Sequence, residues 1–225
     1  MHRRAFLAAS AAAATTLAGC QDIGLGGGTE SGGDSLSDHG AARNIEAQPR
    51  LGPAPDEATG VIVAFEDPSC SRCRAFERQV VPKIKSNLTD AGKAAYVFRG
   101  YPVVYDWGDP AAHALEATYA RDEDAFWDLL AHYFDEQDSF RSTGTNEVYP
   151  RTKTFLRKST DLDADAVISA AKSEAGDAVQ MDLEAGKDAG AGRTTPHVFL
   201  FRDGEYLTKV SGSTSYDAIS GTLQL

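Results

Sequence analysis

The sequence contains few of the residues on which several common classes of protein depend. Its 225 residues include three cysteines and two methionines, and acidic residues outnumber basic ones by 33 to 22. It has neither a second Cys-x-x-Cys nor a His-x-His cluster, so a closed structural zinc site lacks ligands. No basic stripe appears, and a net charge of −11 repels phosphates, so nucleic acid is not expected as a partner.

A basic head and a short apolar stretch open the chain. Arg3-Arg4 precedes an Ala-rich run that is too short to span a bilayer comfortably, and small residues follow it. This order predicts an export signal over residues 1–19, and the arginine pair resembles a twin-arginine signal. Residues 17–20, Leu-Ala-Gly-Cys, resemble a lipobox, so we expect Cys20 to carry a lipid anchor. A plain signal with a chance cysteine is the alternative.

Residues 20–52 are rich in glycine, serine and acidic residues, and they predict a flexible acidic tether that includes His39. Residues 53–225 are then enough for one hydrophobic core and not clearly two. Arginine outnumbers lysine by 14 to 8. This acidic, lysine-poor composition resembles that of proteins from extreme halophiles, and the whole chain resembles haloarchaeal lipoproteins. An ordinary acidic soluble protein is the alternative.

Apolar patterns predict an α/β domain. Strands are expected near residues 61–66 and 94–101, and the helix between them should run from Cys70 to about Asn87 with a kink at Pro82. A strand–helix–strand unit favours parallel pairing and a right-handed crossover. The later helices are expected at 109–121, 123–137, 149–158, 163–187 (with Gly176 as an interruption) and 215–223, and the later strands at 197–201 and 206–210.

The sequence Cys70-Ser71-Arg72-Cys73 joins the first strand to the first helix. The N-terminus of a helix has unpaired N–H groups and the positive end of the helix dipole, and both favour a thiolate at Cys70. Arg72 and Arg74 add positive charge. A thiolate attacks disulfides, and a second cysteine two residues on can close a disulfide and pass it on. We therefore expect Cys70 to be the nucleophile and Cys73 the resolving thiol.

Two other interpretations of these cysteines are open. A static bridge over so short a loop would contribute little stability, which disfavours a structural role. Alternatively, the two thiolates could hold a soft metal such as Cu(I), together with His197, without catalysis. Only Met1 and Met181 exist, so no methionine-rich tract supports copper.

The element order, with Cys-x-x-Cys after the first strand, resembles the thioredoxin fold. A helical insertion between the second strand and the C-terminal hairpin, at about residues 107–190, resembles the DsbA-like branch of thiol–disulfide oxidoreductases. The motifs that carry the resemblance are the segments 65–76, 96–101 with the following Pro102, 111–117 with Phe126-Trp127, and 194–204, which opens with Thr-Thr-Pro. Together they cover roughly residues 55–225.

The resemblance implies an extracytoplasmic enzyme without a cofactor, on the outer face of the cytoplasmic membrane. It implies that Pro196 is cis beside the cysteines, that Thr195 offers backbone groups to a client chain, and that Ser71 and Arg72 tune the redox potential. Clients would be exported proteins, and a membrane protein would be the redox partner. We expect thiol oxidation; reduction or isomerisation on the same fold is the alternative. Relatives often bury an acid at the position of Ala64, where it handles protons. Glu66 and Asp67 lie nearer the loop, and the sequence assigns neither as its replacement.

Overall fold

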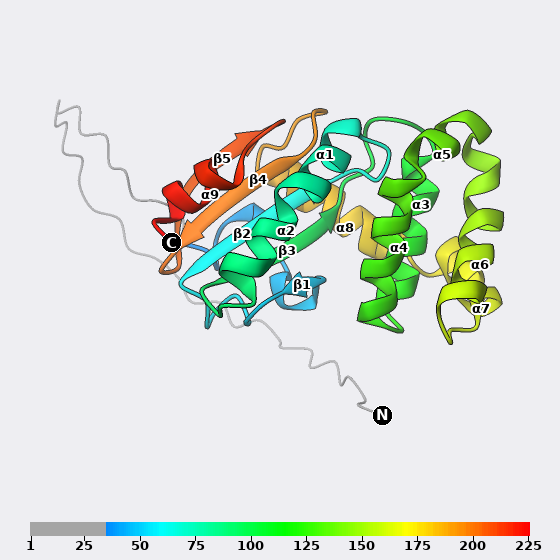
Figure 1. Ribbon diagram of the computed structural model, residues 1–225, viewed down its shortest axis with the longest axis horizontal. Helices are drawn as coiled ribbons and strands as arrows, with labels where there is room; N and C mark the ends of the chain where they lie inside the picture. Colours follow the sequence, from blue (N-terminus) through cyan, green and yellow to red (C-terminus); the bar gives the residue numbers. More distant parts are fainter. Residues whose placement is uncertain (1–34) are drawn as a thin grey trace, which may run out of the picture. The chain divides into compact units, whose positions relative to one another are not determined.

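The computed structural model describes residues 35–225, and these form one unit around a central sheet (Figure 1). The predicted export signal, the lipobox and Cys20 lie outside the described residues. Within the described part of the chain, no helix combines the length and the apolar character that are needed to cross a membrane.

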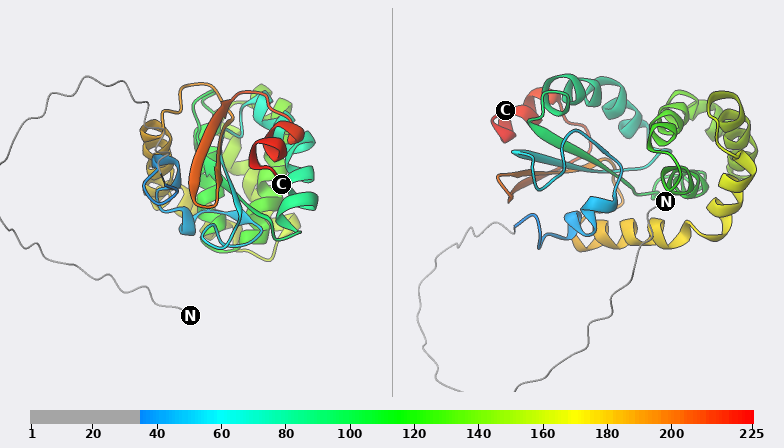
Figure 2. Two further views of the ribbon diagram at one scale, coloured as in Figure 1. Left: turned by 90° about the vertical axis from the view of Figure 1, so that its left-hand side faces the viewer. Right: turned by 90° about the horizontal axis from the view of Figure 1, so that it is seen from below.

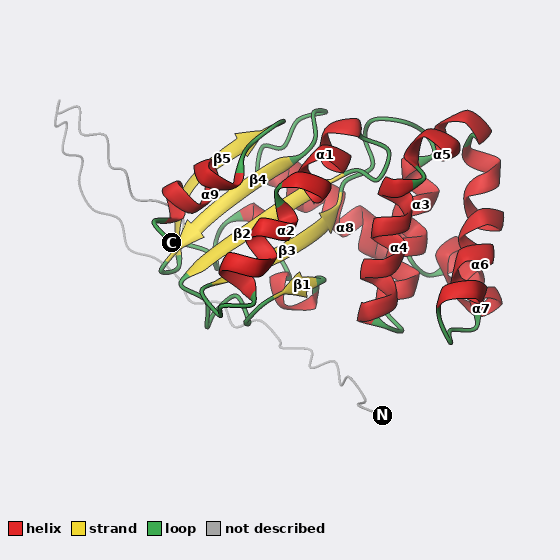
Figure 3. Cartoon of the chain, in the orientation of Figure 1, coloured by secondary structure: helices red, strands yellow, loops and turns green. Residues whose placement is uncertain are grey.

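The sheet has five strands in the order β1-β3-β2-β4-β5 (Figure 3). The strands are β1 (Arg50–Leu51), β2 (Gly60–Glu66), β3 (Ala94–Gly100), β4 (His197–Arg202) and β5 (Glu205–Ser211). β2 and β3 are parallel, as their connection through a helix predicts, whereas β4 lies antiparallel to both β2 and β5. The thioredoxin-like architecture expected from the sequence is therefore confirmed.

The central strand β2 is buried on both faces of the sheet. Ile62 and Ala64 belong to the larger hydrophobic cluster on one face, and Val61, Val63 and Phe65 belong to a second cluster on the other. This division follows from the two-residue period of a strand, which sends successive side chains to opposite faces. A strand covered on both sides needs a continuous apolar run, which explains its composition.

One face of the sheet carries α1 (Ser71–Gln79), α2 (Val81–Ile84), a π-helical turn (Lys85–Thr89) and α9 (Tyr216–Leu223) (Figure 2, right). The first helix ends at Gln79, Val80 separates it from α2, and Pro82 lies within the first turn of α2. Proline lacks the N–H that would continue the preceding ladder, so the expected kink is present as a break between two helices.

The opposite face carries α8 (Gly176–Asp188) together with the 3-10 helices η1 (Gly40–Ala42) and η2 (Ile45–Ala47) (Figure 2, right). The predicted interruption at Gly176 is real, because α7 ends at Ser173 and α8 begins at Gly176. The helix packs against β3 and η1 and contributes Ala185 to the second core cluster. The sheet is therefore enclosed between two helical layers.

The remaining helices form a block beside the sheet (Figure 3). They are α3 (Gly108–Tyr119), α4 (Glu123–Asp135), α5 (Gln137–Thr143), η4 (Thr145–Glu147), α6 (Val148–Ser159) and α7 (Ala164–Ser173). Their apolar faces meet around Phe126, Tyr133 and Phe140, which are all fully buried. The insertion expected over residues 107–190 thus contains α3–α8. Of these helices, α3–α7 form the block beside the sheet, whereas α8 packs on the sheet.

The segment 35–51 does not behave as the tether that the sequence predicted as far as residue 52. His39 stacks on Tyr206 with ring centroids 4.6 Å apart, and β1 pairs antiparallel with β3. A buried ion pair fixes this segment further. Arg99 bonds to Asp182 at 2.7–2.9 Å, and its Nη1 donates to the carbonyls of residues 41 and 43. The ordered domain therefore begins well before residue 53.

Candidate active site

Cys70 is the N-cap residue of α1, at the end of the turn that follows β2. Its backbone is extended (φ −83°, ψ 124°), so the side chain stands at the mouth of the helix, and only 3% of the residue is exposed. Its sulfur lies 3.4 Å from the carbonyl oxygen of Thr195, to which the protonated thiol donates. Both Cys70 and Cys73 are free thiols in this structure. The sequence-predicted nucleophile therefore lies where a helix N-terminus and a distant loop meet.

The pKa of Cys70 is lowered to about 5. The largest cause is a hydrogen bond from the Cys73 thiol, and the backbone N–H groups of Cys73 and Arg72 add to it, against the opposing effect of burial. The two backbone donors are unpaired N–H groups of the first helical turn, which stabilise a negative charge. Cys70 is consequently a thiolate at neutral pH.

Cys73 lies one turn further along α1 and is fully buried. The backbone N–H of Asp67 approaches its sulfur at 3.5 Å. Burial raises the pKa of Cys73 well above its ordinary value, and the charge of Glu66 raises it further. The two sulfurs therefore differ in chemistry as well as in position, because one holds a negative charge and the other holds a proton.

The Thr195–Pro196 peptide bond is cis, as the resemblance implied. Both residues are buried, and the Thr195 carbonyl faces the Cys70 sulfur. His197 follows and uses both ring nitrogens, since Nε2 accepts from the Gly192 N–H at 3.0 Å and Nδ1 lies 2.8 Å from the Ser211 hydroxyl. These contacts of His197 therefore stabilise the loop that leads to Thr195.

The fully buried Glu66 and the partly exposed Glu77 form an acid pair beside the cysteines, and no sequence motif pointed to this pair. The phenol oxygen of Tyr96 is 2.7 Å from Glu66 Oε1 and 2.9 Å from Glu77 Oε1. One O–H can donate to only one carboxylate, so the second contact is a hydrogen bond only when a carboxyl group carries a proton. Burial raises the pKa of Glu66 well above its ordinary value, with a further contribution from Glu77, and burial also raises the pKa of Glu77 to about 7.

Asp67 joins the turn before Cys70 to the loop after β3. Its Oδ1 accepts from the N–H and hydroxyl of Ser69 at 2.7 and 2.6 Å. Its Oδ2 accepts from the backbone N–H groups of Val103 and Val104 at 2.8 and 2.7 Å. Four donors satisfy this fully buried carboxylate, which therefore holds the turn in place.

The insertion also contacts the turn. Gln137, the first residue of α5, donates from Nε2 to the carbonyl oxygens of Pro68 and Cys70 at 2.8 and 3.0 Å. Ser71 and Arg72, the predicted tuning residues, occupy the exposed first two positions of α1. No group of three or more cysteine, histidine or acidic side chains within residues 35–225 could hold a metal ion.

Comparisons with known proteins agree with this geometry. "Disulfide bond formation protein D" of Bacillus subtilis is 32% identical over 109 residues, which make up 48% of this chain and 47% of that protein. "Probable disulfide bond formation protein D" of Bacillus anthracis is 33% identical over 82 residues, or 36% of this chain and 38% of that protein. The chain thus spans less than half the length of these curated relatives.

Solved structures share the fold at lower sequence identity. BdbD from Bacillus subtilis, in its oxidised form, superposes with a TM-score of 0.65 at 23% identity and covers 80% of this chain and 92% of its own. Alpha-DsbA1 from Wolbachia pipientis has a TM-score of 0.65 at 22% identity and covers 79% and 89%. The family model described as "Thioredoxin" matches residues 49–223. Because this match includes the sheet, the cysteine pair and the cis-proline loop, the chain belongs to the thioredoxin family.

Proposed function

We propose that this protein is a thiol–disulfide oxidoreductase that oxidises the thiols of exported proteins. One observation carries the proposal: Cys70, with a pKa lowered to about 5, stands between a helix N-terminus and a cis-proline loop, one turn from the buried thiol of Cys73. A static disulfide has no need of two cysteines whose proton affinities are so different. The names of the curated relatives, disulfide bond formation proteins, support the same chemistry.

The reaction begins with the oxidised Cys70–Cys73 pair. A client thiolate attacks the Cys70 sulfur, which forms a mixed disulfide and releases Cys73 as a thiolate. A second client thiolate then attacks the client sulfur of the mixed disulfide and releases Cys70. Two client thiols become one disulfide, and the enzyme gains two electrons. Cys70 is a good leaving group because its pKa is low.

Glu66 would manage the proton of Cys73 during these steps. A buried thiolate at Cys73 and a buried carboxylate at Glu66 repel each other, so the charge of Glu66 raises the proton affinity of Cys73. The site therefore favours a single negative charge shared between them. When the client releases Cys73, the protonated carboxyl group supplies the proton, and Glu77 shares the resulting charge through Tyr96 until a proton from solvent restores the carboxyl group.

The direction of electron flow follows from the thiolate. Hydrogen bonds that stabilise the Cys70 thiolate stabilise the reduced enzyme, and a stable reduced form makes the disulfide a stronger oxidant. Oxidation of clients is therefore favoured over their reduction or isomerisation. The predicted lipid anchor at Cys20 would hold the domain on the outer face of the cytoplasmic membrane, where a membrane protein would reoxidise the pair.

Copper binding is the weaker function for this site. His197 is the candidate that the sequence offered for a third ligand, and both of its ring nitrogens are occupied by Gly192 and Ser211. A metal would need to break one of these contacts.

The test is oxidation of a reduced dithiol peptide by the oxidised protein, and the loss of free thiol measures its progress. Wild-type protein should oxidise the peptide stoichiometrically, and Cys70→Ser should be inactive. Cys73→Ala, with Cys70 first activated as a mixed disulfide with thionitrobenzoate, should react with a peptide that contains one cysteine, release thionitrobenzoate and stop at the Cys70–peptide disulfide, which mass spectrometry detects. Unchanged oxidation by the Cys70→Ser variant, or tight anaerobic binding of Cu(I) with no thiol exchange, contradicts the proposal.

A further inference from the structure

Three arginines near Cys70 form no ion pair within residues 35–225, in a protein with a net charge of −11. We name Arg72, Arg141 and Arg193 the arginine rim. All three are exposed, and the ion pairs of the described residues join other side chains. Since acids are abundant on this surface, unpaired arginines around the nucleophile are a local reversal of the protein's charge.

The positions of Arg72 and Arg193 follow from the segments that carry them. Arg72 is the second residue of α1, two positions after the N-cap Cys70. Arg193 lies two residues before Thr195, whose carbonyl oxygen is 3.4 Å from the Cys70 sulfur. The two arginines therefore belong to the two segments that enclose the sulfur, one on each side.

Arg141 reaches the same region from the insertion. Gln137, one turn before it on α5, donates to the carbonyl oxygen of Cys70, and Figure 1 shows α1 and α5 at the same edge of the molecule. The Arg141 guanidinium lies over the Tyr105 ring, 4.4 Å from its centroid. Tyr105 in turn donates its backbone N–H to the Ser69 hydroxyl at 3.1 Å. The guanidinium is thus tied to the turn before Cys70.

Neighbouring acids do not cancel this charge. Asp138 already pairs with Arg74 at 3.1 Å, so the exposed Asp106, which follows Tyr105 in the chain, is one carboxylate against the three arginines of the rim. Val104 and Tyr105 are 36% and 45% exposed, and they are two of the three large apolar side chains exposed in the described part of the chain. The surface beside the nucleophile is therefore both cationic and apolar.

We propose that the arginine rim selects client segments in which acidic residues flank the reacting cysteine. The inference rests on the proposed function, because it names the clients of the same site. Guanidinium groups pair with carboxylates in a planar, two-point geometry. The rest of the surface repels acidic chains, so the attraction acts only near Cys70 and orients the client's sulfur toward it.

The experiment traps clients on Cys70 in the Cys73→Ala variant. Three peptides of equal length are used, each with one cysteine activated as a mixed disulfide with thionitrobenzoate. The cysteine is flanked by glutamates, by serines or by lysines. At low salt the glutamate peptide should react on the order of fivefold faster than the lysine peptide, and ~1 M salt should abolish most of this difference, because the Debye length is then about 3 Å.

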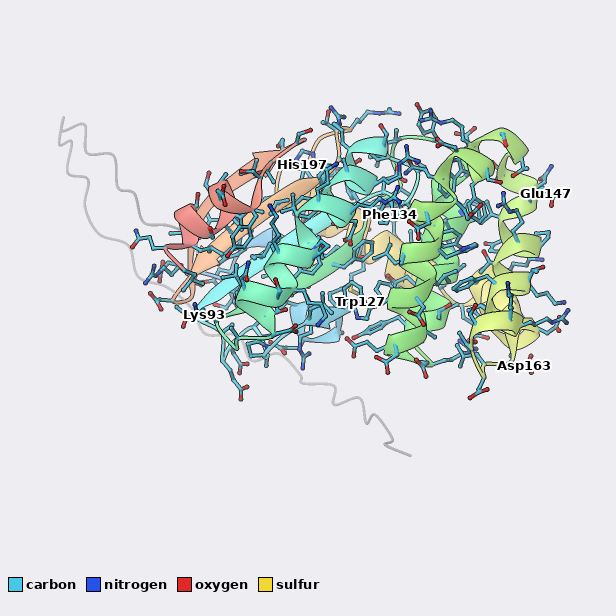
Figure 4. All side chains as sticks on the ribbon, viewed as in Figure 1. Lys93, Trp127, Phe134, Glu147, Asp163 and His197 are labelled. Carbon is cyan, nitrogen blue, oxygen red and sulfur yellow. The ribbon has the colours of Figure 1, made fainter. Side chains whose placement is uncertain are left out.

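Two charge-reversal variants separate the rim from the global charge. Arg141→Glu with Arg193→Glu should invert the preference, whereas two reversals away from the site should not. Lys93→Glu with Lys158→Glu is the matched control, because both lysines are exposed and neither forms an ion pair within the described residues. Lys158 lies at the end of α6, five residues before Asp163, and Figure 4 shows Lys93 and Asp163 far from His197 of the proline loop. Comparison of one peptide across the variants cancels the intrinsic reactivity of that peptide.

The inference is overturned if the rim variant keeps the wild-type order of peptides, or if the control pair changes the order equally. The proposed function is tested separately, with protein that retains both Cys70 and Cys73. This protein should oxidise a peptide that contains two cysteines flanked by serines. Trapping without a charge preference refutes the rim alone. Charge-selective trapping without oxidation refutes the oxidase proposal alone.

Discussion

Replacement of Cys73 by alanine should raise the pKa of Cys70, because the Cys73 thiol is the largest single cause of its low value of about 5. A hydrogen bond to a charged group contributes about 1.5–3 kcal/mol. One pKa unit corresponds to about 1.4 kcal/mol, so loss of this donor should raise the pKa of Cys70 by about one to two units. The helix N–H groups remain and should keep the value below that of a free cysteine.

Cys73→Ser is the matched control, since its hydroxyl can donate to the Cys70 sulfur. The ultraviolet absorbance of the thiolate, recorded from strongly acidic to mildly alkaline pH, reports the midpoint directly, and the pH dependence of alkylation by iodoacetamide provides a second measurement. The serine variant should titrate near pH 5, and the alanine variant near about pH 6 to 7.

Equal midpoints in the alanine and serine variants would refute this reasoning, because the charge of Cys70 would then depend on the helix alone. A midpoint in the serine variant as high as that of a free cysteine would also contradict the proposed hydrogen bond, because a hydroxyl donor at position 73 would then not lower the pKa of Cys70. Circular dichroism of both variants establishes that the fold is retained.

Three further predictions concern the same site. The reduction potential should fall by about 59 mV per pH unit below pH 5 and by about 30 mV per pH unit above it, because reduction takes up two protons only while Cys70 is protonated; equilibration with glutathione measures this break. Glu66→Gln should flatten the pH dependence of stability in urea titrations. Burial raises the pKa of Glu66 in the folded protein, so the contribution of Glu66 to stability is present in full below its ordinary pKa of 4.5. This contribution is lost as the pH rises through the pKa of the folded state, by about 1.4 kcal/mol for each pH unit between the two pKa values. A Glu66→Gln variant with the pH dependence of the wild type would contradict a buried, protonated Glu66. Asp67→Asn should lower the free energy of unfolding in urea titrations by about 3 kcal/mol, because the amide turns donors toward two N–H groups. Asp106→Asn, at an exposed position of the next loop, should change it by less than about 0.5 kcal/mol in the same titrations.

Long periodic segments made most of the fold predictable. The buried run of β2, the amphipathic stripe of α4 and the Asp-Gly turn before β5 each follow a local pattern, so each element lies within two or three positions of where the sequence predicts it. The break before Pro82 and the interruption at Gly176 followed from local backbone chemistry.

Short elements could not be predicted in this way. The segment 35–51 contains two 3-10 helices and a two-residue strand, which are too brief to show a period. Its order depends on tertiary contacts, such as the bonds from Arg99 to its carbonyl oxygens and the stacking of His39. Composition alone therefore favoured a tether. The seven-residue helix α5, whose Gln137 supports the cysteine turn, is too short to predict for the same reason.

The acid beside the cysteines shows why a fixed sequence offset is a poor guide to a site. The family resemblance directs attention to Ala64, which is apolar, although Glu66 is two residues further along the same strand. Because side chains alternate along a strand, Glu66 points to the same face as Ala64, about 7 Å nearer the cysteine turn. Glu77 stands four residues after Cys73, on the same side of α1, and meets Glu66 through Tyr96. What the chemistry requires is a carboxyl group on the face that carries the cysteines, in a place that water does not reach. A two-residue displacement along the strand preserves both conditions, whereas a one-residue displacement would turn the carboxyl group to the other side of the sheet.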